Sequence, residues 1–153
     1  MEAANNAKHV VSISLGSSKR DAGAILELGG RKISIERRGT DGDFDRARQL
    51  LEQWDGKADA IGLGGTDLYV YAGKKRYTFR ESAHLIANVK KTPVLDGSGL
   101  KNSLERKLIE SLAAGGEVPI KGSRVLLVCG VDRFGMAGAL LGGGAGVNLG
   151  DLF

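Results

Sequence analysis

The fold of this chain is decided by residues 124–151, which read RVLLVCGVDRFGMAGALLGGGAGVNLGD. An apolar run at residues 125–129 leads into a turn that begins at Gly130, a helical stretch follows, and a second apolar run ends at Asp151. The order of strand, glycine turn, helix and strand is typical of the first unit of a dinucleotide-binding fold. We therefore expect residues 121–153 to form a Rossmann-like βαβ segment.

The turn carries most of the fingerprint for a dinucleotide, but not all of it. The fingerprint has three glycines, and this chain has Gly130 and Gly135 with Asp132 at the middle position. A carboxylate there would repel a pyrophosphate, so altered or weak binding, or an ordinary strand-turn-helix, is the alternative. Asp151 follows the next apolar run at about the twenty-residue distance of the ribose-binding acid, which would favour NAD over NADP. The candidate cofactor residues for NAD or NADP are Gly130, Asp132, Gly135 and Asp151.

Composition limits the classes of protein that this chain can be. The 153 residues include 24 glycines but only two prolines, which indicates an ordered, turn-rich domain. Cys129 is the one cysteine and cannot form an internal disulfide, so we expect a cytoplasmic protein. The net charge of +4 comes from a mixed surface, which favours a small anionic or polyol ligand over nucleic acid. No apolar run approaches the roughly 18 residues of a membrane span, and we expect no metal site.

The preceding residues predict a mixed α/β region at 8–120, after a flexible tail at 1–7. Helices are expected where apolar residues recur every three or four positions, and strands where they alternate. The expected strands are residues 10–15, 23–28, 32–37, 58–63 and 92–95, with a hairpin at 69–79, and the expected helices are residues 44–54, 80–88, 134–141 and the stretch marked by Leu100, Leu104, Leu108 and Leu112. The first three strands can pair antiparallel. The fold class is therefore α/β, with a mixed N-terminal sheet with hairpins followed by the βαβ segment, all in one cooperative unit.

Two further pairs of residues follow predicted strands. Ser17 and Ser18 stand after the first strand between a glycine and a lysine, where backbone N–H groups can bind a phosphate; a simple tight turn is the alternative. Asp96 and Lys101 lie after the strand at 92–95, and such a pair can take the proton of a substrate hydroxyl. The competing interpretation makes Ser98 a helix cap and Lys101 a solvated residue. We treat Lys101 and Asp96 as the candidate catalytic residues.

Two family resemblances accompany these patterns. About the first hundred residues are similar to the actin-like sugar kinases and acetate kinases, which implies nucleotide phosphate near Ser17 and Ser18. The segments HVVSISLGSSKRDAG, TDGDFDRA, DAIGLGGTDLYVYAGKKRY, TPVLDGSGLKNSLER and RVLLVCGVDRFGMA resemble bacterial proteins carried under the name quinate 5-dehydrogenase. That resemblance implies a pyridine-nucleotide oxidoreductase acting on a polyhydroxylated cyclohexane carboxylate, with a lysine-aspartate pair near the substrate. Its members look longer, and a complete dinucleotide domain needs strands after Asp151, so we expect a shortened relative.

The leading functional prediction is an NAD(P)-dependent dehydrogenase-like protein of the quinate and shikimate type. One alternative is a noncatalytic nucleotide-binding or self-assembling module, a homo-oligomer that pairs through its C-terminal strand at residues 147–153. The other alternative is an actin-like phosphotransferase.

Overall fold

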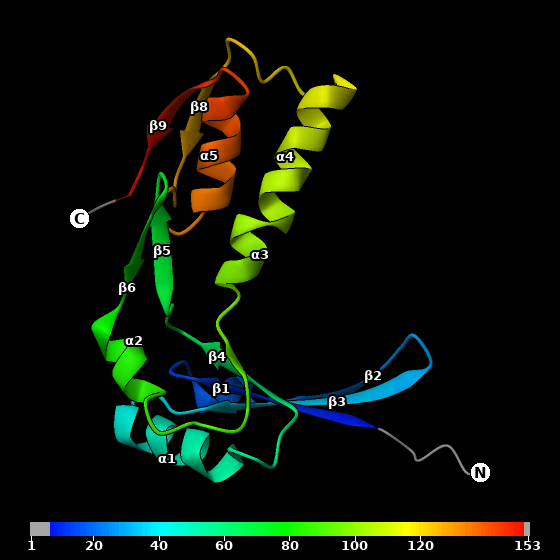
Figure 1. Cartoon of the computed structure of the whole chain (residues 1–153), viewed down its shortest axis with the longest axis vertical. Coiled ribbons are helices and arrows are strands. Elements are labelled where there is room, and N and C mark those ends of the chain that lie inside the picture. The colour runs from blue at the N-terminus through cyan, green and yellow to red at the C-terminus, as the bar shows by residue number, and fades with distance from the viewer. Residues whose placement is uncertain (1–6, 152–153) are drawn as a thin grey trace. The chain divides into compact units, whose positions relative to one another are not determined.

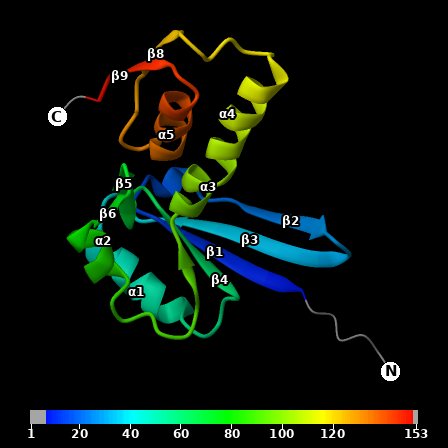
Figure 2. The same cartoon turned by 45° about the horizontal axis from the view of Figure 1, so that its top comes forward.

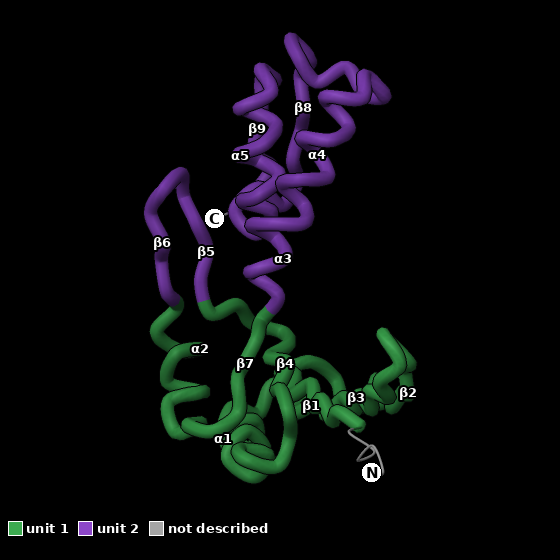
Figure 3. Tube along the Cα trace, turned by 45° about the vertical axis from the view of Figure 1, so that its right-hand side comes forward, with its two compact units in different colours: residues 1–68, 79–96 green, residues 69–78, 97–153 purple. Residues whose placement is uncertain are grey.

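The computed structural model describes residues 7–151, which form two compact units (Figure 3). Unit 1 runs to Leu68 and resumes at Phe79–Asp96, whereas unit 2 comprises Tyr69–Thr78 and the chain from Gly97 onward. The predicted boundary near residue 120 therefore lies inside unit 2. The predicted tail at residues 1–7 falls outside the described residues except for Ala7.

Unit 1 is built on a five-stranded mixed sheet, as the fold class predicted. Its strands are β1 (Lys8–Ser14), β2 (Gly23–Leu28), β3 (Arg31–Gly39), β4 (Ala60–Gly64) and β7 (Val94–Leu95), in the order β2-β3-β1-β4-β7. Strand β1 is parallel to both β3 and β4, and β4 is parallel to β7. Only β2 runs antiparallel, in the predicted hairpin with β3 that turns at Gly29 and Gly30. The carboxyl ends of β1, β3, β4 and β7 consequently meet at one edge of the sheet.

Antiparallel pairing of the first strand is a wrong prediction. Val10 of β1 lies opposite Ile35 of β3 in parallel register. The reason is the connection: the 3-10 helix η1 (Ser18–Arg20) and all of β2 lie between the two strands. A connection of that length allows the crossover that parallel pairing requires, and it leaves β2 at the edge.

Two helices and one face of the sheet enclose the core of unit 1. Helix α1 (Phe44–Trp54) begins where predicted, because the Asp43 side chain accepts the Arg46 N–H and caps it. Helix α2 (Arg80–Leu85) lies on the same side of the sheet as α1 (Figure 1). The buried residues of this core are Val11, Ile13, Ala47, Leu51, Ala58, Ile61, Leu63 and Leu85.

The described residues of unit 2 form two separate strand pairs and three helices. Strands β5 (Tyr69–Ala72) and β6 (Lys75–Thr78) form the predicted hairpin, and helices α3 (Ser98–Asn102) and α4 (Leu104–Gly115) follow Gly97. Strand β8 (Arg124–Leu127), helix α5 (Phe134–Gly142) and strand β9 (Gly146–Leu149) then form a βαβ unit with parallel strands. Helices α4 and α5 lie side by side in both views (Figures 1 and 2).

Three of the four leucines that predicted one helix face the solvent, and Leu112 is half-buried. The helix is interrupted at Ser103, and Leu100, Leu104 and Leu108 are 60%, 61% and 54% exposed. Ile109 is the buried residue of α4, and it packs with Leu140 and others in a small second core. The four-residue spacing of the leucines predicted the helical conformation correctly. The face of α4 that packs against α5 is the adjacent one, which carries Ile109.

None of the helices in residues 7–151 is both long and apolar enough to cross a lipid bilayer.

Candidate functional site

The turn between β8 and α5 is held by the carboxylate of Asp151. Asp151 Oδ2 accepts the Gly130 N–H at 2.8 Å, and the two carboxylate oxygens accept the Val131 N–H at 3.1 and 3.2 Å. The Arg133 N–H donates to the Cys129 carbonyl at 2.8 Å and leads the chain into α5. The sequence paired Gly130 with Asp151, and the structure brings them into direct contact. An anion therefore already occupies the two amides at which a dinucleotide phosphate would bind.

Packing within unit 2 requires a glycine at residue 135, and a side chain at residue 130 would have to displace its neighbour. A Cβ on Gly135 would overlap the Lys101 carbonyl oxygen, because α5 approaches α3 closely at this point. A Cβ on Gly130 would overlap the Leu149 side chain of β9. The atoms that a side chain at either position would meet therefore belong to the protein itself and not to a bound nucleotide.

A pocket of about 310 Å³ adjoins this turn. The lining is mostly apolar, with Tyr71 and Phe134 as its aromatic residues and their ring centroids 5.5 Å apart. Gly130 and Val131 contribute the turn, and Arg106 is the one charged residue in the lining as far as residues 7–151 form it. The remaining lining residues are Val70, Ala72, Gly73, Ala137, Gly138, Leu141 and Leu149. Such a pocket can receive a planar ring beside one phosphate-binding cation.

Lys101 belongs to a charged network at the start of α5. Its Nζ forms an ion pair with Asp132, which also contacts Arg133 at 3.2 Å, and Arg133 forms an ion pair with Glu105. The hydrogen bond that Arg133 donates to Glu105 is the main cause that raises the pKa of Arg133 above its ordinary value. The sequence singled out Lys101 and Asp132 separately and missed that they pair, because they lie 31 residues apart.

Asp96, the predicted catalytic partner of Lys101, belongs to unit 1. Its Oδ2 accepts the Leu68 N–H at 2.6 Å and joins the end of β7 to the segment after β4. The catalytic assignment of Asp96 and Lys101 stays a prediction.

Ser17 and Ser18 lie at the carboxyl edge of the unit 1 sheet, directly after β1. The Ser18 N–H donates to Asp41 Oδ1 at 2.8 Å, and Ser17 Oγ accepts the Lys19 N–H at 3.3 Å. Asp41 has a φ of 53°, a left-handed conformation that is uncommon for a residue other than glycine. Hydrogen bonds from Ser18, first from its hydroxyl and then from its backbone, lower the pKa of Asp41. The predicted phosphate loop therefore binds a carboxylate of its own chain.

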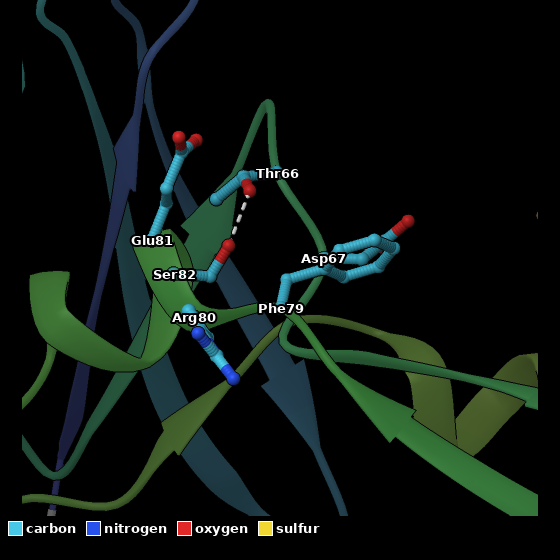
Figure 4. A pocket seen from close by; sticks show the side chains of 6 residues that line it. All are labelled: Thr66, Asp67, Phe79, Arg80, Glu81 and Ser82. Atoms are coloured by element: carbon cyan, nitrogen blue, oxygen red, sulfur yellow. Dashed lines mark hydrogen bonds between the residues drawn. The ribbon is translucent and has the colours of Figure 1, made fainter.

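A second pocket, of about 340 Å³, follows the carboxyl end of β4 (Figure 4). Thr66 Oγ1 and Ser82 Oγ lie 2.6 Å apart, and Ser82 is buried. The other lining residues are Asp67, Phe79, Arg80 and Glu81. Both signs of charge and two hydroxyls suit a small polar ligand. Sequence reasoning missed this pocket, although Gly64-Gly65-Thr66-Asp67 after a buried strand was a signal for it.

Comparison with protein families divides the chain near the boundary between the units. The family model described as Domain of unknown function (DUF8753) matches residues 9–96, and the model described as Domain of unknown function (DUF8754) matches residues 99–153. No curated protein and no solved structure matches this chain.

Proposed function

We propose that this chain, which belongs to the family described as Domain of unknown function (DUF8753), is an NAD(P)-dependent dehydrogenase-like protein of the quinate and shikimate type. The observation that carries the proposal is the β8-α5-β9 unit, in which Asp151 contacts the Gly130 turn beside an apolar pocket. A strand, a glycine turn, a helix, a parallel strand and an acid after it are the components of a Rossmann-like segment.

The pocket supports a nucleotide as the ligand of unit 2. Tyr71 and Phe134 offer ring faces to a base or a nicotinamide, and Arg106 offers a guanidinium to a phosphate. Gly130 and Val131, whose N–H groups donate to Asp151, also line the pocket. These groups distinguish this pocket from an ordinary gap in an apolar core.

Asp151 would change partners when the nucleotide binds. Its carboxylate and a phosphate cannot both accept the Gly130 and Val131 N–H groups, because two anions at that distance repel each other. Released from the turn, Asp151 would accept hydrogen bonds from a ribose and disfavour the extra phosphate of NADP. NAD is therefore the expected cofactor.

The proton step is assigned to Lys101 with Asp132, the carboxylate of its ion pair in unit 2. In the proposed reaction the substrate carbon loses a hydride to the nicotinamide ring and its hydroxyl loses a proton to this pair. The substrate class, a polyhydroxylated carboxylate, rests on the resemblance to the quinate dehydrogenases.

Filling the pocket tests the proposal directly. Ala137 lines the pocket, and Ala137→Leu should weaken NAD binding by about tenfold or more in calorimetric titration. Ala114→Leu, on an exposed position of α4, is the matched control and should leave binding unchanged. Reduced nicotinamide should form when quinate or shikimate is added with NAD. Absence of NAD and NADP binding to the unaltered chain would contradict the proposal.

A second function, that of a noncatalytic self-assembling module, is favoured by the two-stranded sheet of β8 and β9. Leu126 of β8 and Leu149 of β9 are 66% and 55% exposed, and each strand has one partner strand among the described residues. Pairing through β9 would make a homo-oligomer. A monomer in sedimentation at all accessible concentrations would exclude it.

A further inference from the structure

The positive net charge of the protein belongs to unit 2. Unit 2 contains nine lysines and arginines but only five aspartates and glutamates, whereas unit 1 contains thirteen of each. Over the whole chain the charge of +4 belongs to a mixed surface, but the division into units concentrates it in one of them. A charge asymmetry of this kind is typical of the part of a protein that binds a polyanion.

The β5-β6 hairpin carries three consecutive cations of unit 2 at its tip (Figure 1). A two-residue turn of Gly73 and Lys74 joins the strands, and Lys75 and Arg76 begin β6. All three basic residues are exposed, and the hairpin contains no acidic residue. None of the three forms an ion pair with a carboxylate of residues 7–151. The positive charge at the tip is thus not neutralised within the described part of the chain.

One face of the hairpin presents an aromatic ring and a cation to the solvent. Lys75 and Tyr77 share this face, because side chains alternate along β6. Lys75 Nζ lies 5.0 Å from the centroid of the Tyr77 ring, and Tyr77 is 46% exposed. A ring with a cation beside it is the arrangement that stacks a nucleic acid base next to its phosphate.

The other face of the hairpin is engaged by its own chain. The Arg76 guanidinium lies over the Tyr69 ring at 4.0 Å from its centroid. Tyr71 packs against Phe134 of α5, with the ring centroids 5.5 Å apart. These contacts hold the hairpin in unit 2, and they leave the Tyr77 ring on the opposite face to a ligand.

We propose that the β5-β6 hairpin binds single-stranded nucleic acid, with a base stacked on Tyr77 and phosphates at Lys74 and Lys75. Stacking on a side chain requires a base that is free of its neighbours, which a single strand provides and a duplex does not. An anionic membrane would meet the same charges, but Gly73 and Lys74 at the tip offer no large apolar side chain to insert. This function goes beyond the proposed dehydrogenase, whose pocket is lined by neither lysine and not by Tyr77.

The salt dependence of binding tests the phosphate contacts. The probe is a fluorescent oligouridine of about 12 nucleotides, titrated with the full chain in an anisotropy assay. Two phosphate contacts predict that the logarithm of the association constant falls with the logarithm of the salt concentration at a slope of about −1.4. Lys74→Gln should halve this slope, because one contact is lost. Lys107→Gln removes the same charge from an exposed position of α4 and should leave the slope unchanged.

A second pair of variants tests the stacking contact. Tyr77→Leu should weaken the binding of oligouridine by about tenfold or more, because the aromatic surface is lost. Tyr77→Phe keeps the ring and should change the affinity by less than about twofold. The thermal unfolding midpoint should be the same in both variants, which shows that the hairpin variants are folded.

Four results would overturn the proposal. They are no binding of oligouridine, equal slopes for Lys74→Gln and Lys107→Gln, equal affinities of Tyr77→Leu and Tyr77→Phe, and binding of a duplex of the same length more tightly than the single strand. Binding to phosphatidylserine vesicles without binding to oligouridine would identify a membrane surface instead.

NAD separates this surface from the proposed function. Lys74→Gln should leave NAD affinity unchanged, whereas Ala137→Leu should weaken NAD binding and leave oligouridine binding unchanged. Failure of one site therefore does not imply failure of the other.

Discussion

Unit 1 and unit 2 are stabilised by different kinds of contact. Unit 1 has a continuous sheet with Val11, Ile13, Leu51 and Ile61 fully buried. In unit 2 each sheet has two strands, and its buried apolar residues retain 5 to 9% exposure. Unit 2 depends instead on close backbone packing at Gly135 and on the contacts of Asp151. The comparison indicates that unit 1 is held by its core and that unit 2 is the part a ligand would stabilise most.

The largest expected effect is on unit 2, from Gly135→Val. The new side chain would overlap the Lys101 carbonyl and force α5 away from α3. We expect the free energy of unfolding to fall by about 4 kcal/mol or more. Amide hydrogen exchange should show unit 2 unprotected while unit 1 stays protected. Gly142→Ala, in the same helix with nothing within 4 Å of the added Cβ, is the control and should be neutral or stabilising by up to about 1 kcal/mol.

The second-largest expected effect is on the stability of unit 1, from Leu51→Ala. This side chain is fully buried between α1 and the sheet, so its truncation should lower the free energy of unfolding by about 3 kcal/mol in chemical denaturation. Leu28→Ala removes the same atoms from a residue that is 70% exposed and should cost less than about 0.5 kcal/mol. Similar losses in the two variants would contradict a core-dependent unit 1.

A smaller effect is expected for Asp151→Ala. The Gly130 and Val131 N–H groups lose their acceptor, which should cost about 1 kcal/mol and accelerate hydrogen exchange at the turn. Asn148→Ala on the exposed side of β9 should leave exchange at the turn unchanged. An unchanged turn in Asp151→Ala would show that the carboxylate does not hold it.

The smallest expected effect is a pH dependence of the stability of unit 1. Asp55 accepts the N–H groups of Lys90, Lys91 and Thr92, and these bonds, the Lys90 bond most of all, lower the pKa of its carboxyl group. The stabilisation is complete above about pH 4, the ordinary carboxyl pKa, and is lost as the pH falls through the lower folded-state pKa. Thermal unfolding of the unaltered chain and Asp55→Asn should therefore differ most near neutral pH and converge in acid. Asp45→Asn, at a side chain that is 82% exposed, is the matched control for the loss of one carboxylate.

Local patterns predicted the elements well because local physics determines them. Asp43 and the apolar spacing after it specify α1, and the left-handed glycines Gly29 and Gly30 specify the hairpin between β2 and β3. The strand, turn and helix order after Arg124 was also sufficient to predict the parallel βαβ unit.

Pairings between distant residues could not be read from the sequence. The parallel partner of β1 depends on a crossover, and the ion pair between Lys101 and Asp132 depends on the packing of α3 against α5. Arg20 and Arg37 meet at Gly16 because the loop after β1 folds back beside β3. Each of these contacts is a property of the folded chain and leaves no spacing signal in the sequence.

Hydrogen exchange of the full chain with and without NAD tests the central claim most directly. We expect NAD to slow exchange at residues 128–134 and 146–151, which form the turn and its β9 partner, and to leave β1, β3 and β4 unchanged. No protection of these segments at saturating NAD, or protection confined to unit 1, would contradict the assignment of a nucleotide site to unit 2.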